Sequence, residues 1–172
     1  MDAFNPTTKT QAALTAALQA ASAAGNPEIR PAHLLMALLT QTDGIAGPLL
    51  EAVGVSPATI RAEAQHLVDR LPTSSGATSQ PQLSRESLAA INAAQQLATE
   101  MNDEFVSTEH LMVGLATGDS DVATCIASVD GNPIANGAPL PDSIGVHSFV
   151  VTAIDKTPVG PRTNLEPAGG PV

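Results

Sequence analysis

The amino-acid sequence predicts an all-α fold built from two related four-helix units, the second of which is cut short. Three observations support this prediction. Aromatic residues make up only 2% of the chain although hydrophobic residues make up 43%, so the core must consist of small aliphatic side chains, which suit close helix packing. Apolar residues recur at helical spacing over residues 8–123. Finally, this pattern repeats at an offset of about 77 residues.

The first unit, residues 4–71, contains four expected helices with recognisable starts. Thr7 is a candidate N-cap of the first helix, and Ser56 is one for the fourth. Pro31 suits the first position of the second helix, whose apolar residues on nearly every side predict central burial. The expected helical ranges are 8–24, 31–39, 45–53 and 57–71.

The helical pattern restarts after residues 72–82, a segment rich in proline, serine and threonine that predicts a flexible polar linker. The two units are expected to pack on each other about a pseudo-twofold axis, because they present similar apolar faces. The matching pairs are Thr7 with Ser84, Leu14 with Ile91, Ala17 with Ala94, Ala21 with Ala98, Ile29 with Val106, His33-Leu34 with His110-Leu111, and Leu38 with Leu115.

The second unit, residues 83–123, stops inside its third helix, and a different composition follows from 124 to 172. The missing helices predict uncovered apolar faces over 84–101 and 107–116, and therefore a marginal or oligomeric domain unless the tail covers them. In the tail, residues 125–129 and 146–155 have features of strands, which allows a β-hairpin. The proline-rich and glycine-rich end, from about residue 157, predicts disorder.

The net charge of −10 bears on partners and location. A surface this negative repels phosphate backbones and anionic lipids, so neither nucleic acid nor a membrane surface is an expected partner. The sequence contains one cysteine, no leader-like N-terminal segment and no apolar run of about 20 residues. These features predict a cytoplasmic protein.

The sequence shows no pattern typical of an enzyme. It lacks the glycine-rich phosphate loop with its lysine. No spacing of His or Cys residues matches a metal site, and Cys125 has no context that would make it a nucleophile. His33 and His110, at equivalent positions of the two units, are expected to make structural hydrogen bonds to a neighbouring loop or helix end. We therefore expect no catalysis, no cofactor and no metal.

Several segments have residues and spacings that occur together in one known family. Together they resemble the double Clp N-terminal domain of ClpB-type protein disaggregases, over residues 3–123. The segments are Phe4 to Ala17, Ile29 to Leu39, Leu49 to Gly54 and Phe105 to Leu111.

The resemblance implies an eight-helix fold that contacts unfolded or aggregated polypeptides for an ATP-driven motor, which is absent here. Thr7, Asp103 and Glu109 match family positions implicated in that activity. Each also has a plain structural interpretation, respectively as a helix cap, a loop residue and a charge near a helix N-terminus. The family's apolar groove is expected at Leu97, Leu111 and Met112.

The tail resembles a second family, because residues 131–140 and 145–155 are similar to part of the Ig-like repeats of bacterial surface proteins. This stretch is too short for a whole sandwich, so a fusion, frameshift or assembly artefact near residue 123 is a hypothesis. The expected function is an ATP-independent polypeptide-binding module. The alternatives are an adaptor-like protein that docks on a complete Clp machine, a non-functional truncated or fusion product, and a surface protein led by the tail, against which the lack of a leader argues.

Overall fold

The computed structural model describes residues 3–52, 54–76, 80–129 and 132–133. Helices dominate this part of the chain, which confirms the predicted all-α class. Its helices are α1 (Thr8–Ala23), α2 (Pro31–Thr40), α3 (Ala46–Ala52), α4 (Pro57–Asp69), α5 (Arg85–Glu100), α6 (Thr108–Thr117) and α7 (Asp121–Ala127). Its strands are β1 (Glu28–Ile29), β2 (Gln82–Leu83), β3 (Ser128–Val129) and β4 (Asn132–Pro133).

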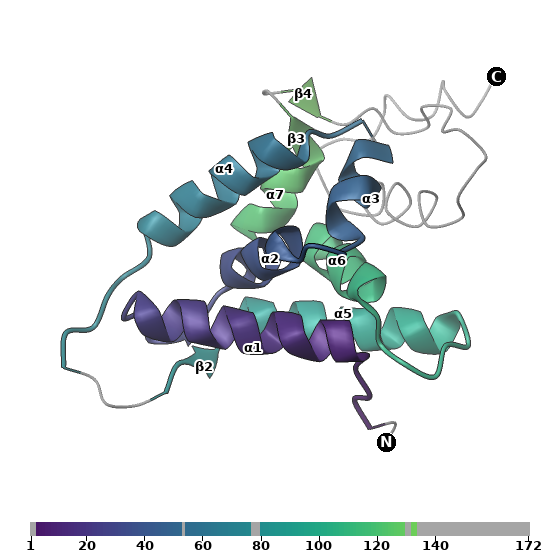
Figure 1. The fold of residues 1–172 in the computed structure, drawn as a ribbon, viewed down its shortest axis with the longest axis horizontal. Helices are drawn as coiled ribbons and strands as arrows, with labels where there is room; N and C mark the ends of the chain where they lie inside the picture. The colour runs from purple at the N-terminus through teal and green to yellow at the C-terminus, as the bar shows by residue number, and fades with distance from the viewer. Residues whose placement is uncertain (1–2, 53, 77–79, 130–131, 134–172) are drawn as a thin grey trace.

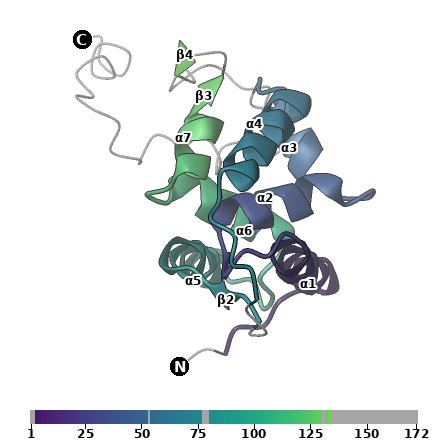
Figure 2. The same ribbon diagram turned by 90° about the vertical axis from the view of Figure 1, so that its left-hand side faces the viewer.

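The helices lie in three tiers (Figure 1, Figure 2). Helices α1 and α5 run antiparallel to each other along one side of the molecule. Helices α2 and α6 form the middle tier, and α3, α4 and α7 cover its other side. Helices α1 to α4 form repeat 1, while α5 to α7 are the described helices of repeat 2. None of the helices in the described part of the chain combines the length and apolar character needed to cross a membrane.

Short parallel β pairings join the two repeats in a symmetric way. Strand β1 pairs with β2, which places Ile29 opposite Leu83, and an isolated parallel bridge places Pro6 opposite Val106. The repeat offset that relates Thr7 to Ser84 also relates Pro6 to Leu83 and Ile29 to Val106. Each repeat therefore pairs the segment before its first helix with the segment before the other repeat's second helix. This is the geometry expected of a pseudo-twofold axis.

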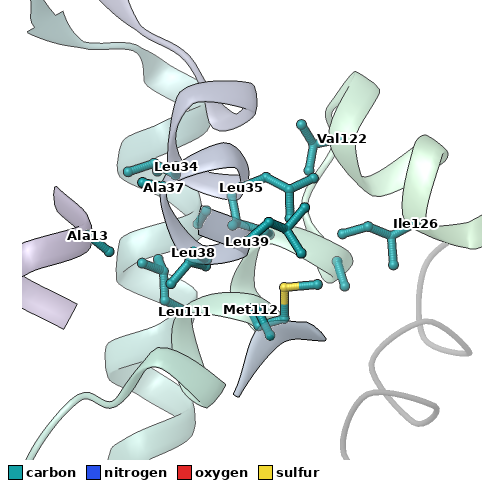
Figure 3. Packing of buried hydrophobic residues seen from close by; sticks show 14 of the residues in the cluster. Ala13, Leu34, Leu35, Ala37, Leu38, Leu39, Leu111, Met112, Val122 and Ile126 are labelled. Atoms are coloured by element: carbon teal, nitrogen blue, oxygen red, sulfur yellow. The ribbon is translucent and has the colours of Figure 1, made fainter. Parts of the chain in front are cut away.

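The core centres on α2 and α6, which supports the central burial predicted for α2 (Figure 3). Leu34 and Leu35 are fully buried, and so are their counterparts in repeat 2, Leu111 and Met112. Helix α7 adds Val122 and Ile126, which point toward α2 in Figure 3. Small residues of α1 and α5, such as Ala13, let these helices approach the middle tier closely.

Two expectations about the second repeat are wrong. The apolar face of α6 is not uncovered, since residues 111–116 are all buried beneath α2, α5 and α7. Residues 125–127 are helical rather than extended, because α7 continues to Ala127 and only Ser128–Val129 forms strand β3. Strand β3 pairs with β4 in an antiparallel hairpin. The expected strand over 146–155 and the expected disorder after it lie outside the described residues.

Candidate functional site

A small groove lies where the end of α5 meets the start of α6. Its cavity has a volume of about 200 Å³. The floor is apolar and the rim carries two carboxylates, which is a suitable combination for holding part of an extended peptide. The lining residues are Leu97, Met101, Asp103, Ser107, Glu109, His110 and Val113.

The turn after α5 places Asp103 at the groove. Asn102 adopts a left-handed conformation with φ of 61°, which reverses the chain after the helix C-cap. The Asp103 amide then donates to the Ala98 carbonyl at 2.8 Å, which fixes the loop against the end of α5. Its carboxylate faces the first turn of α6 and remains 47% exposed.

His110 connects the loop to the helix. Its Nδ1 accepts the backbone N–H of Ser107 at 3.0 Å, and the Ser107 hydroxyl lies 2.9 Å from the same nitrogen. Because Nδ1 accepts, the ring hydrogen belongs on Nε2, which lies 3.1 Å from Asp103 Oδ2. The carboxylate therefore orients the imidazole, and the imidazole caps α6. This supports the structural role expected of His110.

Repeat 1 contains the same arrangement with one chemical difference. His33 Nδ1 accepts the Arg30 amide at 3.0 Å, and its Nε2 lies 3.1 Å from Asn26 Oδ1. Burial lowers the pKa of His33, the hydrogen bond with the Arg30 backbone opposes this shift, and the positive charge of Arg30 adds to it, so the net effect favours the neutral imidazole. The repeat offset maps Asn26 onto Asp103, so an amide in repeat 1 corresponds to a carboxylate in repeat 2.

The structure brings three of the expected site residues to the groove, namely Leu97, Asp103 and Glu109. Glu109 lies in the first turn of α6, where its charge complements the helix N-terminus. Thr7 is not among the lining residues. It caps α1 by accepting the Thr10 amide at 3.2 Å, and its own amide donates to the Val106 carbonyl at 3.0 Å.

Leu111 and Met112 do not belong to the groove. They are 1% and 0% exposed and pack in the core around α2. The apolar surface of the groove instead comes from Leu97, Met101 and Val113. A usable signal for Met101 was its place one turn after Leu97, at the end of α5.

The described residues contain no group of three His, Cys, Asp or Glu side chains that could hold a metal ion. The only cysteine of the sequence, Cys125, is a poor nucleophile, because burial and the nearby negative charge of Glu63 raise its pKa to about 11. The thiol is therefore protonated near neutral pH.

Comparisons with known proteins place these features in one family. The family model "Clp repeat (R) N-terminal domain" matches residues 5–128, which extends past residue 123, where the sequence pattern was expected to stop. The chaperone protein ClpB of Mycobacterium tuberculosis is 78% identical over 135 residues, which is 78% of this chain and 16% of the relative. ClpB of Mycobacterium leprae is 71% identical over 133 residues, or 77% of this chain and 16% of the relative. The chain thus spans about a sixth of the length of these relatives.

Solved structures show the same fold at low sequence identity. The Hsp104 N-terminal domain from Candida albicans matches with a TM-score of 0.63 at 13% identity, covering 88% of this chain and 90% of that one. The N-terminal domain of the ClpV1 ATPase from E. coli matches with a TM-score of 0.61 at 24% identity, covering 74% of each chain.

Proposed function

The chain belongs to the Clp repeat N-terminal domain family, and we propose that it is a polypeptide-binding module that holds unfolded or aggregated chains without ATP. The observation that carries the proposal is the groove between α5 and α6, where Leu97, Met101 and Val113 form an apolar floor. Met101 is 37% exposed although it is a large apolar residue, so an incoming side chain can reach it. Burying such a surface favours capture of exposed apolar segments.

The size of the groove favours weak binding. A cavity of about 200 Å³ takes roughly one or two side chains of a peptide. The ordering of an unfolded chain also opposes association, so an affinity in the micromolar range or weaker is expected. Weak and reversible contacts suit a module that passes its clients on to a motor.

The proposed domain organisation places the module in residues 1–123, with repeat 1 at 4–71, the linker at 72–82 and the partial repeat 2 at 83–123. Residues 124–172 form a tail in this proposal. The first residues of the tail complete α7, which ends at Ala127, so a shortened chain that ends at residue 123 would lack the buried Ile126 of the core. Expression from residue 1 to residue 133 is the appropriate minimal test of autonomous folding.

Binding of fluorescent, reduced casein to the full chain without nucleotide tests the proposal. Leu97→Gln should weaken binding, because it replaces part of the apolar floor. The matched control is Leu88→Gln, which alters a leucine of the same helix that is 49% exposed and is not a lining residue. Absence of casein binding at high micromolar concentration, or equal effects of the two variants, would contradict the proposal.

A further inference from the structure

The groove of repeat 2 has a counterpart in repeat 1 that is partly covered by the chain itself. The repeat offset maps Asp103, Ser107 and Glu109 onto Asn26, Arg30 and Ala32. The segment that follows α4 lies at these positions. Leu71 lines one cavity with Arg30 and Ala32 and a second with Asn26 and Arg30.

The covering segment shows how a backbone is held at this place. Asn26 Nδ2 donates to the Pro72 carbonyl at 3.1 Å, while Asn26 Oδ1 faces His33 Nε2 at 3.1 Å. The amide thus serves two partners at once, because it contains both an acceptor and a donor. Repeat 1 therefore holds a carbonyl of its own chain, that of Pro72, at the position that corresponds to Asp103.

Repeat 2 presents the opposite hydrogen-bonding character. Asp103 keeps the acceptor that His110 needs, but an ionised carboxylate has no donor to offer a carbonyl. Glu109 adds a second carboxylate where repeat 1 has Ala32, and Ser107 replaces the cationic Arg30. Among the described lining residues of the groove there is neither a lysine nor an arginine. An occupant must therefore bring donors, and positive charge matches the rim best.

We propose that the groove of repeat 2 selects extended segments in which a lysine or arginine adjoins an aliphatic residue. The aliphatic side chain lies on Leu97, Met101 and Val113, and the cation faces Asp103 and Glu109. Each chain offers one such site, because the corresponding positions of repeat 1 carry Asn26 and Ala32 in place of the two carboxylates, and Asn26 already donates to the Pro72 carbonyl. This inference rests on the proposed function and adds the chemistry of the preferred segment.

Three blocked peptides test the preference at low salt by fluorescence anisotropy and calorimetry with the full chain. They share a short leucine-rich core and differ at one adjacent position, which is lysine, glutamine or glutamate. Lysine should bind about threefold more tightly than glutamine, and glutamate more weakly still, as expected for one exposed ion pair. The stoichiometry should be one peptide per chain. Equal affinities for all three, or two sites per chain, would overturn the inference.

Two charge-matched variants locate the source of the preference. Asp103→Asn should remove most of the advantage of lysine over glutamine, and its asparagine can still accept from His110 as Asn26 does from His33. Glu51→Gln removes one negative charge on the exposed side of α3 and should keep the preference. An unchanged lysine-to-glutamine ratio in Asp103→Asn would refute the inference, while binding of all three peptides by the wild type would leave the proposed function standing. If none of the peptides and no casein binds, the proposed function fails as well.

Discussion

His110 Nε2 lies 3.1 Å from Asp103 Oδ2, across the loop that joins α5 to α6. This single contact ties the rim of the groove to the cap of α6, because the other ring nitrogen of His110 accepts the Ser107 amide. Asp103 therefore has two roles, and a substitution such as Asp103→Ala removes both of them at once. It is an acidic residue at the groove, and it orients a buried imidazole.

The first prediction separates these two roles through stability. Asp103→Ala should lower the free energy of unfolding by about 1 kcal/mol, because it leaves a buried N–H without its acceptor. Asp103→Asn should cost much less, since repeat 1 uses the Asn26–His33 pair in the same place. Urea denaturation followed by circular dichroism measures both. Equal losses in the two variants would show that His110 does not depend on this acceptor.

The second prediction concerns pH and His33. Burial lowers its pKa below the ordinary value of 6.5, with the charge of Arg30 acting in the same direction and the hydrogen bond to the Arg30 backbone opposing both. Below that pH the unfolded chain takes up a proton that the folded chain does not, so stability falls as the pH falls from about 6.5 toward the folded pKa. The slope contributed by one such group is at most about 1.4 kcal/mol per pH unit.

His33→Gln should flatten this part of the stability profile, measured by urea denaturation between pH 5 and pH 8. His66→Gln is the matched control, because it removes an imidazole on the exposed face of α4. A steep acid dependence that survives in His33→Gln would contradict the assignment.

Much of the architecture was predictable because the repeat makes each local signal count twice. Thr7 and Ser84 were expected as equivalent caps, and each accepts the amide of the residue three positions later, at 3.2 Å and 3.1 Å. The β pairing between repeats was not predicted, since a two-residue strand has no periodicity to detect. The repeat offset contained a usable signal for another contact. It aligns Asn26 with Asp103, and these two residues are the equivalent partners of His33 and His110.

The groove was only partly predictable. Three of the residues singled out from the sequence, Leu97, Asp103 and Glu109, line the same groove. Leu111 and Met112 were wrongly expected there, because α6 is apolar on nearly every side and its sequence does not show which face meets α2. Their counterparts Leu34 and Leu35 were already expected to be buried, so the repeat itself argued against the choice.

The third prediction tests whether Thr7 acts only as a cap. Thr7→Ala should cost about 1 kcal/mol of stability, and Thr7→Ser should restore most of it, because both hydroxyls can accept the Thr10 amide. Ser84→Ala should cost a similar amount, since Ser84 caps α5 in the same way. Thermal melts measure all three variants.

The same three variants should bind casein with unchanged affinity under conditions where they are folded. Thr7 lies outside the groove lining, so a cap-only residue has no direct effect on a bound peptide. A binding loss in Thr7→Ala that Ser84→Ala does not share would instead assign Thr7 a direct part in the activity that the family resemblance implies.

The fourth prediction concerns the crossing of α5 and α6. Gly114 lies on α6 where a Cβ would clash with the Ala90 carbonyl oxygen and lie 3.2 Å from the Ala94 nitrogen. Backbone atoms of a helix cannot move aside as a flexible side chain would, so Gly114→Ala must separate the two helices. We expect a loss of about 1–3 kcal/mol in the free energy of unfolding, as is typical of overpacking.

Gly47→Ala is the control, because Gly47 lies in α3 with nothing within 4 Å of the added Cβ. The control should be stabilised by about 0.5–1 kcal/mol through helix propensity alone. A Gly114→Ala variant that is as stable as the wild type, or more stable, would rule out the close crossing.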